Sequence, residues 1–328
     1  MSLRRVACRA RVSTATVSRV VNDSGPVKPS TRARVLEAIE AFNYSPNLHA
    51  RSLAGGTSRS IGVIVSSLDN PFFLDVYLAV ETRAHDAGYD VIMAHTDYTP
   101  ARLATSVRLM LGHRVAGVAA IVSEMNATLT AALGGQRIPV VFYDARSPRR
   151  NITNIRVDYE SGMEKLMSYL YSLGHRHIGV LVHRVSLKPL NERHKAVLAA
   201  VGRYSTGRVA VVAGADTLEG GRRAARALLD GNPRLTAVVC VNDLMAVGAL
   251  WELRKSGRRV PDDVSVTGFD DITLAQFCQP ALTTMHIPRD TIGQMICDVL
   301  INRDGVPPSH EFVIHPELVL RESSGPCR

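Results

Sequence analysis

The sequence has 328 residues, 46% of them hydrophobic, which suffices for about two or three domains with packed cores and excludes wholesale disorder. No apolar run reaches membrane-spanning length, no export signal is present, and the five scattered cysteines lack CxxC spacing, so we expect a cytoplasmic protein with reduced thiols and no membrane partner. The net charge of +9 lies mainly in residues 1–59, which hold ten Lys/Arg and three Asp/Glu, whereas residues 60–328 hold 29 and 27.

The basic N-terminal segment predicts a helix-turn-helix. Residues 6–10 and 12–22 each carry one apolar stripe at helical spacing, and Ser13 can cap the second helix. The opposite face of that helix is small, polar or basic, and consists of Thr14, Ala15, Ser18, Arg19 and Asn22. Such a helix can enter the DNA major groove and reach base edges. A plain amphipathic hairpin and a solvated basic tail are the alternatives.

A third helix, which Ser30 or Thr31 can begin, closes a three-helix head. Pro46 stops the helical pattern, and residues 48–54 then make barely two turns before a glycine pair. Because so short a helix is unstable alone in water, we expect it to be a linker that folds only against a partner.

From residue 61 onward, short β-branched runs alternate with helix-length segments. The expected strands are 61–65, 91–94, 117–122 and 140–143, and then 178–182, 209–213, 237–241 and 264–268. Two such series predict an α/β body of two doubly wound parallel sheets, with ligands bound beyond the carboxyl ends of the strands. The motifs GxGxxG after a strand, GxxxxGK[ST] and HExxH are absent, so we expect neither an enzyme nor a cofactor.

Motifs that run along nearly the whole chain carry a family resemblance. They are Val12 to Asn22; Tyr44-Ser45-Pro46-Asn47 with Ala50 and Leu53; Ile61 to Ile64; Asp69-Asn70-Pro71-Phe72-Phe73; Leu173-Gly174-His175; Asn242-Asp243; Gly268-Phe269-Asp270-Asp271; Leu282-Thr283-Thr284; and Leu320 to Ser323. In this order and spacing they resemble the LacI/GalR family of repressors. The resemblance implies a helix-turn-helix head followed by a body like the periplasmic binding proteins.

The resemblance also implies domain bounds. They are a DNA-binding head at 1–45, a hinge helix and linker at 46–59, and an effector-binding and dimerisation domain at 60–328. Within that domain, the N-subdomain would span about 60–157 plus 287–315, and the C-subdomain about 158–286 plus 316–328. The alternation of strands and helices from residue 61 onward does not by itself predict this recrossing of the chain.

The resemblance places base reading on Thr14, Ala15 and Arg19, and Arg19 can pair bidentately with guanine. Further DNA contacts are expected at Ser13, Thr16, Ser18, Asn22, Thr31, Tyr44, Asn47 and Ala50. Leu53 matches the family's minor-groove wedge, although it could instead pack on the body. Two linker helices must meet for this wedge to act, which implies a homodimer on a near-palindromic operator in double-stranded DNA. Ser13 could also be a cap alone.

Eight residues form the expected effector site: Asp69, Phe72, Phe73, Asp144, Arg193, Asp216, Asn242 and Asp270. Aromatic side chains beside polar groups suit a small polar effector, such as a sugar or nucleoside, with a sugar-like molecule favoured. Three alternatives stay open. Phe72 or Phe73 could be core, Asn242 or Asp243 could simply cap a helix, and Asp216 could form a capping pair with Glu219 three residues on.

Several residues depart from the family pattern. They are Arg5, Arg11, His183, Ala196, Val197 and Asp216. Arg11 could strain the turn of the head or add a phosphate contact, and both possibilities stay open. Asp216 replaces an aromatic side chain that stacks on the ligand, so a charged wall would favour a polyol or a ligand with a donor-rich or cationic edge. The histidines at 175, 177 and 183 are interpreted as structural or surface residues rather than metal ligands.

The sequence therefore predicts a dimeric transcriptional repressor whose operator affinity depends on a small molecule in the cleft. The molecule could act as an inducer or as a corepressor, and the sequence leaves both alternatives open. A periplasmic sugar-binding module shares the body architecture but leaves the basic head unexplained. A nucleotide-dependent enzyme is disfavoured because the phosphate-binding loops are absent.

Overall fold

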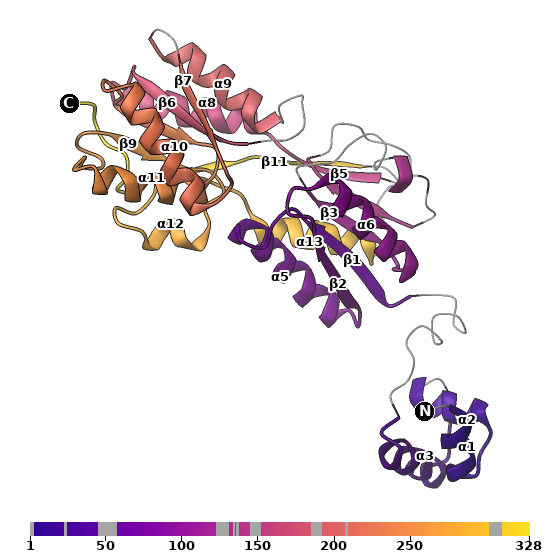
Figure 1. Ribbon diagram of the computed structural model, residues 1–328. Helices are drawn as coiled ribbons and strands as arrows, with labels where there is room; N and C mark the ends of the chain where they lie inside the picture. Colours follow the sequence, from indigo (N-terminus) through magenta and orange to yellow (C-terminus); the bar gives the residue numbers. More distant parts are fainter. Residues whose placement is uncertain are drawn as a thin grey trace. The chain divides into compact units, whose positions relative to one another are not determined.

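The computed structural model describes residues 3–22, 25–44, 58–122, 131–133, 135, 138–144, 152–184, 192–206, 209–301 and 310–328. The chain divides into two compact units, Met1–Ser58 and Arg59–Arg328, which are shown in Figure 1. Asn47, Ala50 and Leu53, three of the expected DNA contacts, lie outside the described residues, as does the side chain of Asn22. In the described part of the chain, no helix has the length and apolar composition that a membrane span requires.

The N-terminal unit contains three helices, α1 (Leu3–Ala10), α2 (Thr14–Asn22) and α3 (Pro29–Ala41). Their apolar stripes form one small core of Val6, Ala7, Ala10, Val17, Val20, Val35 and Ala38. The Ser13 hydroxyl accepts a hydrogen bond from the backbone N–H of Thr16 at 3.1 Å, which confirms the predicted cap of α2. The predicted three-helix head is therefore present.

The start of α3 corrects the sequence-based expectation. The helix begins at Pro29, with Lys28 as its N-cap, and not at Ser30 or Thr31. Proline suits the first helical position because it has no N–H to leave unpaired there. The backbone N–H of Thr31 and that of Arg32 both donate to the Lys28 carbonyl at 3.0 Å. The cap is therefore made by the backbone and not by a hydroxyl.

Sheet A contains six parallel strands in the order β11-β5-β4-β3-β1-β2. They are β1 (Ser60–Val65), β2 (Asp90–His95), β3 (Val118–Ile121), β4 (Val140–Tyr143), β5 (Ile152–Val157) and β11 (Glu311–Ile314). Helix α6 (Pro100–Gly112) packs on the face that carries Phe142, whereas α5 (Pro71–Asp86) and α13 (Arg289–Leu300) pack on the face of Val141. Successive residues of β4 thus serve opposite layers, as strand alternation requires. We call sheet A with these helices the first subdomain.

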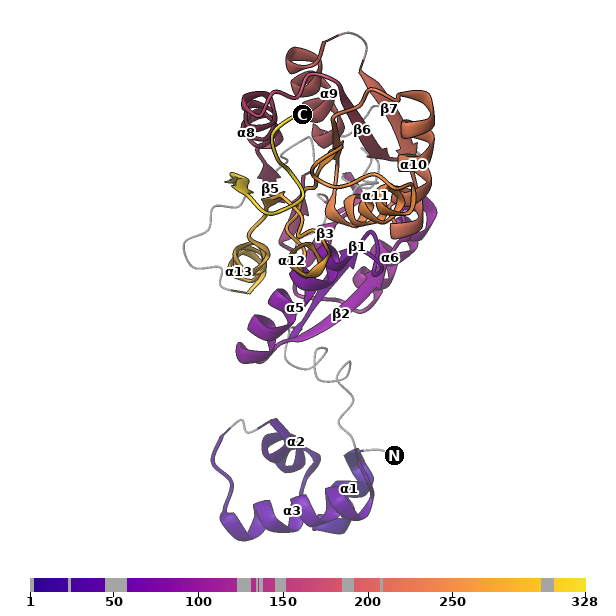
Figure 2. The ribbon, with the colours of Figure 1, turned by 90° about the vertical axis from the view of Figure 1, so that its left-hand side faces the viewer.

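Sheet B contains four parallel strands in the order β7-β6-β8-β9. They are β6 (Ile178–His183), β7 (Ala210–Gly214), β8 (Ala237–Cys240) and β9 (Ser265–Thr267). The helices of this second subdomain are α8 (Tyr159–Ser172), α9 (Glu192–Tyr204), α10 (Leu218–Gly231), α11 (Asp243–Lys255) and α12 (Thr273–Phe277). Strands β10 (Thr284–His286) and β12 (Glu317–Val319) form a separate antiparallel pair. Figure 2 shows the C-terminus within the second subdomain.

The two parallel sheets confirm the predicted fold class, but four strands were not predicted. β10, β11 and β12 are only three or four residues long, and β5 interleaves apolar residues with Thr153, Asn154 and Arg156. The chain reaches sheet A again through β11 and then returns, because the Val266 N–H donates to the Ser323 carbonyl at 2.8 Å beside β9. The two subdomains are thus joined by several crossings of the chain.

Candidate functional site

Helix α2 presents a polar face opposite its buried one. Thr14, Ala15 and Arg19 are exposed, whereas Val17 and Val20 belong to the core of the head. One face of the helix therefore anchors it, and the other is free to approach a partner. Small side chains at its first turn would let the helix backbone come close to base edges.

Four further expected DNA contacts, Ser13, Thr16, Thr31 and Tyr44, lie at the starts of α2 and α3 and after the end of α3. The hydroxyls of Ser13 and Thr16 are 2.9 Å apart and share a hydrogen bond, so these two residues form one polar unit at the start of the helix. Thr31 lies in the first turn of α3, and Tyr44 follows the end of α3, where it packs partly against the core of the head. The Arg5 guanidinium lies 5.4 Å from the ring centre of Phe42.

The turn before α2 is built on an unusual backbone. Arg11 has a φ of 52°, in the left-handed region where side chains other than glycine are strained. Its N–H donates to the Cys8 carbonyl at 3.1 Å, and the Val12 N–H donates to the Ala7 carbonyl at 3.0 Å. Arg11 is exposed. These values support a strained turn and leave the guanidinium accessible.

In the body, polar residues cluster where parallel strands end, as the fold requires of a ligand site. Asp69 and Asn70 follow β1, Tyr98 follows β2, and Asp144 follows β4. In the second subdomain, His183 ends β6, Asp216 follows β7, Asn242 follows β8, and Asp270 follows β9. Asp69 is exposed, and the contacts described next bring the other members of this set together.

Arg193 and Asp270 form the centre of the cluster. Nη2 of Arg193 lies 3.0 Å from Oδ1 of Asp270, with 12% and 2% of the two side chains exposed. Arg193 also donates to the Val241 carbonyl at 3.0 Å, and its guanidinium lies 4.8 Å from the ring centre of Phe269. Burial raises the pKa of Asp270 to about 6, although the neighbouring Arg193 opposes this shift. The pair thus offers a rigid, charged surface that can bind hydroxyl or amide groups.

The backbone that carries Asp270 is strained and held from the first subdomain. Asp270 and Asp271 have φ values of 113° and 56°, which favour glycine. The guanidinium of Arg289, on α13, donates to the Asp270 carbonyl at 2.5 Å and to the Asp271 carbonyl at 2.9 Å. Its Nε lies 3.1 Å from Oδ2 of Asp75 on α5. This arginine therefore connects the loop of Asp270 to two helices of the first subdomain.

Asp144 and its neighbours form the first subdomain's side of the cluster. Asp144 has a φ of 60° and accepts a hydrogen bond from the Val157 N–H at 3.4 Å. Burial raises the pKa of its carboxyl, which a hydrogen bond from Tyr159 partly offsets. The hydroxyl of the adjacent Tyr143 is buried and has no hydrogen-bond partner among the described residues. Such an unpaired buried hydroxyl is costly unless a bound molecule or water satisfies it.

Phe72 and Phe73 belong to the core at this place. Both are buried, with ring centres 5.5 Å apart, and Phe72 lies 5.7 Å from the ring of Tyr143. The structure therefore matches the core alternative for these two side chains, and their contact with an effector stays a prediction.

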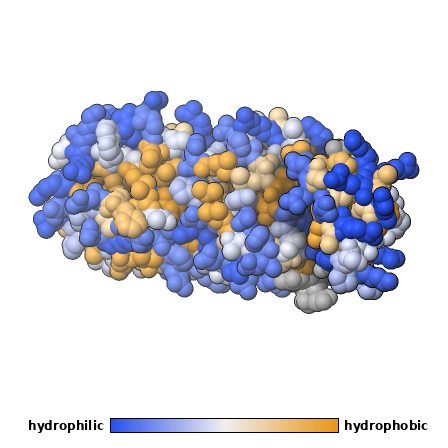
Figure 3. All heavy atoms as spheres, turned by 90° about the horizontal axis from the view of Figure 1, so that it is seen from below, coloured by the Kyte–Doolittle hydropathy of each residue, from blue (hydrophilic) through white to orange (hydrophobic). Residues whose placement is uncertain are grey.

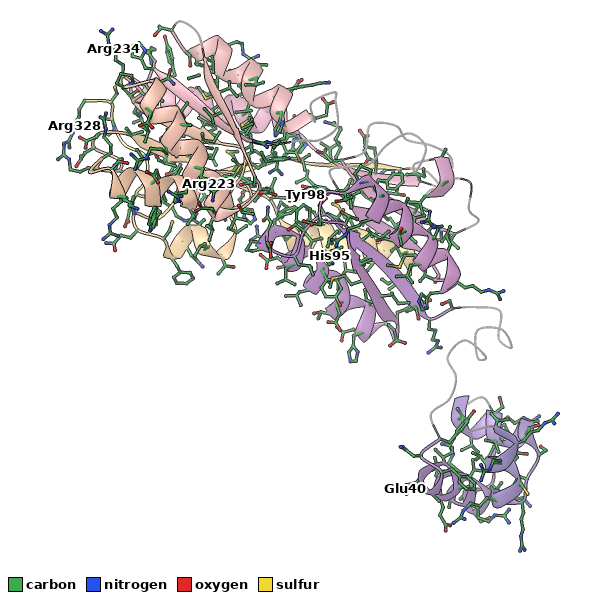
Figure 4. The ribbon with its side chains drawn as sticks, in the orientation of Figure 1. Glu40, His95, Tyr98, Arg223, Arg234 and Arg328 are labelled. Atoms are coloured by element: carbon green, nitrogen blue, oxygen red, sulfur yellow. The ribbon has the colours of Figure 1, made fainter. Side chains whose placement is uncertain are left out.

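Asp216 accepts hydrogen bonds from three side chains. They come from Nδ2 of Asn70 at 3.3 Å, from Nδ2 of Asn242 at 2.5 Å and from the Tyr98 hydroxyl. Figure 4 labels Tyr98 on the side of the first subdomain that faces the second. The alternative that Asp216 caps α10 is wrong, because Thr217 is the N-cap and accepts from the Gly220 N–H at 2.9 Å.

Asn242 is a helix cap as well as a member of this cluster. Its Oδ1 accepts a hydrogen bond from the Met245 N–H at 2.9 Å at the start of α11. The capping alternative is therefore correct for Asn242, but its amide nitrogen remains directed at Asp216. Asp243 follows it, and burial raises the pKa of the Asp243 carboxyl to about 7. Oδ2 of Asp243 accepts from the Ile272 N–H at 2.8 Å, which further fixes the loop after Asp270.

Two histidines complete the wall beside Asp216. Nε2 of His194 lies 3.3 Å from Nδ1 of His183, and both rings are buried. Burial, together with the neighbouring His183 and Arg193, lowers the pKa of His194 to about 3. Burial also lowers the pKa of His183, against the effect of Asp216. Both rings are therefore neutral near pH 7, and Nε2 of His183 has no hydrogen-bond partner among the described residues.

The other two histidines singled out in the sequence lie apart. His175 is buried, with its Nε2 2.9 Å from the Gly325 carbonyl, and His177 is exposed at the start of β6. They therefore lie at the opposite end of β6 from His183. Among the residues that the structure describes, no group of three or more His, Cys, Asp or Glu is arranged to hold a metal ion.

Comparison with known proteins identifies the family. Residues 2–47 match the bacterial regulatory proteins of the lacI family, and residues 167–324 match the periplasmic binding protein-like domain. The chain is 34% identical over 333 residues to the HTH-type transcriptional repressor PurR of Proteus mirabilis, covering 98% of this chain and 96% of that protein. The chain belongs to the lacI family of bacterial regulatory proteins. As a lacI-family member it is a DNA-binding transcriptional repressor and not an enzyme, as the sequence predicted.

Solved structures of lacI-family regulators are similar over the whole chain. The lac repressor dimer bound to operator and the anti-inducer ONPF matches with a TM-score of 0.83 and 28% identity, covering 99% of each chain. A LacI-family regulator from Silicibacter pomeroyi matches with a TM-score of 0.85 and 26% identity, covering 98% and 99%. The CelR–cellobiose complex matches with a TM-score of 0.68 and 28% identity, covering 98% and 99%.

Sequence reasoning missed several members of the cleft. Tyr143 ends β4, and Asn70 and Tyr98 lie in the loops after β1 and β2, so the rule that ligands bind at strand ends could have found them. His194 and Arg289 carry no such signal, because they lie on helices and act through contacts with residues far away in the sequence.

Proposed function

We propose that this regulator binds a near-palindromic operator as a homodimer, and that a small polar, sugar-like effector between the two subdomains controls its affinity for DNA. The observation that carries the DNA-binding part is the two-sided α2 helix. Its valines are locked into the core of the head, while Thr14, Ala15 and Arg19 are exposed together. An arginine in this position can pair with guanine O6 and N7, and the short side chains leave room for a close approach.

The hinge supplies the second part of the DNA contact. Pro46 and the short helical pattern of residues 48–54 fit a linker that folds only when DNA and a second copy are present. Leu53 would then be the apolar wedge in the minor groove. If this proposal is correct, Leu53→Ala weakens binding to the operator and reduces its bending, but leaves non-specific binding unchanged. A variant that bends the operator like the parent would contradict the wedge assignment.

The exposed apolar side chains of the body support the proposal of a homodimer. Large apolar side chains are exposed on both subdomains, namely Leu74 and Leu78 on α5 and Leu274 and Phe277 on α12, and Phe277 is 75% exposed. Figure 3 shows apolar patches among hydrophilic residues on one face of the molecule. Exposed apolar side chains that gather into a patch mark interaction surfaces. The lac repressor, which this chain resembles, is a dimer in its operator complex.

The effector site is the polar cluster at the strand ends. The Arg193–Asp270 pair, the Asp144 carboxyl and the unpaired Tyr143 hydroxyl offer several hydrogen-bonding groups within an otherwise apolar surrounding. Neutral polyhydroxyl molecules can satisfy such groups without bringing a charge into the cleft. Among the structural neighbours, CelR was solved with cellobiose, and a LacI-family regulator from Arthrobacter with lactose. We therefore favour a sugar-like effector, acting in the cytoplasm where the operator lies.

The decisive experiment first identifies the DNA site that the protein binds and then tests which small molecules change its affinity for that site. Fragments of genomic DNA are captured with the full-length protein and sequenced, and the enriched site is then tested in gel shifts against a panel of sugars and metabolites. We expect one near-palindromic site, and a change in its affinity with at least one neutral hydroxylated compound. Enrichment without any common sequence would contradict the DNA-binding part. A response to anionic metabolites alone would contradict the effector part.

A further inference from the structure

We propose that Asp216 ties the two subdomains together across the cleft, so that the body is held closed before any effector binds, and that an entering molecule must supply hydrogen-bond donors to this carboxylate. The proposal deepens the function given above. It rests on that function only in treating the entering molecule as the effector. Asp216 lies on the second subdomain, between β7 and α10. Two of its three donors, Asn70 and Tyr98, lie on the first subdomain, and Asn242 lies on its own.

The two asparagines are fixed in the orientation that this contact needs. Asn70 caps α5 and Asn242 caps α11, and in each case Oδ1 accepts from a backbone N–H, that of Phe72 at 3.1 Å and that of Met245 at 2.9 Å. Because the oxygen of each amide is committed to its helix, the Nδ2 group must point away from the cap. Both Nδ2 groups point at the same carboxylate, one from each side of the cleft. Asn70 and Asn242 are both buried, which adds to this orientation.

Tyr98 is placed at Asp216 at the expense of backbone strain. Asp97 and Tyr98 have φ values of 53° and 54°, so two successive side chains other than glycine occupy the left-handed region. Such strain persists only where surrounding contacts hold it. The ring of Tyr98 lies 6.5 Å from that of Phe73 and 6.4 Å from that of His183, on opposite sides of the cleft. The loop after β2 therefore delivers a phenol to the second subdomain.

The charge of this arrangement determines which molecules can replace it. All three donors to Asp216 are neutral, and among the described residues no Lys or Arg lies within ion-pair distance of its carboxylate. Among the described residues, the charge of Asp216 is therefore stabilised by neutral donors, and an anion that approached it would be repelled by this carboxylate and by the neighbouring Asp270. A hydroxylated or cationic molecule can instead take over the positions of the Tyr98 and Asn70 donors. At this position the chain would therefore select its ligand by hydrogen-bond donors.

Hydrogen exchange of the full-length, ligand-free protein tests the tie directly. Asp216→Ala removes the acceptor, Tyr98→Phe removes one donor and keeps the ring, and Asp230→Ala changes an exposed acid at the end of the same helix α10 as a control. We expect Asp216→Ala to raise the rate of amide exchange about tenfold at residues 66–72 and 96–99 of the first subdomain. These segments are distant from Asp216 in the sequence. Tyr98→Phe should give a smaller change in the same segments, and Asp230→Ala none.

Two outcomes separate the tie from a local structural role. If exchange increases only at residues 214–220, around Asp216 itself, Asp216 merely supports its own loop, and the proposal is wrong. If Tyr98→Phe has its full effect in the Asp216→Ala background, the phenol acts elsewhere, and the proposal is wrong as well. Fluorescence of Trp251, the one tryptophan of the sequence, shows in each variant that the body remains folded. These results do not involve DNA, so they stand or fall independently of operator binding.

The required class of ligand is tested on the same exchange signal. Cellobiose, spermidine and oxalate are added separately to the wild-type protein, as a neutral polyol, a cation with N–H donors and an anion without hydrogen-bond donors. A change in the exchange rate of residues 96–99 on adding the polyol or the cation supports the proposal. A change in exchange with oxalate alone overturns the donor requirement, whereas the tie itself is decided by the variants.

Discussion

Nη2 of Arg193 lies 3.0 Å from Oδ1 of Asp270, and this nearly buried ion pair is the centre of the polar cluster at the strand ends. Helix α9 supplies the arginine, and the strained loop after β9 supplies the carboxylate. Because a charged group that loses its partner in a buried site is costly, the two residues must be retained or replaced together. The pair therefore links the stability of the body to the integrity of its binding site.

Arg193→Met should destabilise the body in a pH-dependent manner. The variant leaves the Asp270 carboxylate buried and unpaired, which costs about 3 kcal/mol or more at pH 8. At pH 5 the loss should be smaller, because burial already raises the pKa of Asp270 to about 6 and protonation removes the lone charge. Urea unfolding followed by Trp251 fluorescence measures both values.

The exposed pair of Arg203 and Glu164 is the control for this prediction. Their side chains are 57% and 44% exposed, so Arg203→Met should cost less than about 1 kcal/mol at either pH. An equal loss of stability at pH 5 and pH 8 in the Arg193 variant would show that packing, and not the ion pair, is responsible.

His194 should make the body less stable in acid. Its pKa is about 3 when folded, below the ordinary 6.5, so between these values the unfolded chain binds a proton that the folded chain does not. The contribution of neutral His194 to the free energy of unfolding is therefore fully present above pH 6.5 and is lost as the pH falls towards 3. At pH 5.5 this residue alone should lower the free energy of unfolding by about 1.4 kcal/mol. His194→Gln should remove that part of the pH dependence.

The comparison for His194 is made between slopes and not between absolute stabilities. Free energies of unfolding are measured at pH 7.5 and 5.5 for the wild type, for His194→Gln and for His177→Gln, which changes an exposed histidine at the start of β6. The wild type and the His177 variant should share one slope. If the His194 variant shows that slope too, the buried ring does not resist protonation as inferred.

The helices of the head were predictable because their signals are local. Ser13 and the valines of α2 are within a few residues of one another, and cap and stripe both follow from that spacing. β5 was not predictable in this way, because polar residues interrupt it and its strand character depends on β4 and β11 on its two sides. Tertiary pairing overrides a weak local pattern there.

The cleft was predictable residue by residue but not as a set of contacts. Arg193 and Asp270 were each predicted to bind a ligand, and the structure shows an ion pair between them. Asp216 was expected to be a charged wall, whereas its three donors come from segments that are distant in the sequence. Which strand ends face each other depends on how the two sheets are brought together, and no local pattern contains that information.

Arg11→Gly should stabilise the head. At a φ of 52° glycine avoids the strain that the arginine side chain carries, which is worth about 1 kcal/mol. Hydrogen exchange of the Val12 amide, which donates to Ala7 in the same turn, should slow about fivefold in the full-length variant. Arg11→Asn should fall between the two, because asparagine tolerates this conformation better than arginine.

The same variant decides between the two roles left open for Arg11. If the arginine also holds a phosphate, Arg11→Gly should lower affinity for every duplex by a similar factor and reduce the salt dependence of binding by about one charge. Faster exchange of the Val12 amide in Arg11→Gly would contradict the strain argument altogether.

The central claim is that α2 reads DNA sequence, and fluorescence anisotropy on the selected operator tests it most directly. The wild type should bind this duplex on the order of 1,000 times more tightly than a scrambled duplex at physiological salt. Arg19→Ala should lower that ratio by about 10-fold to 100-fold, whereas Arg34→Ala, on the exposed surface of α3, should leave the ratio unchanged. Equal affinities of the wild type for the two duplexes would contradict the account.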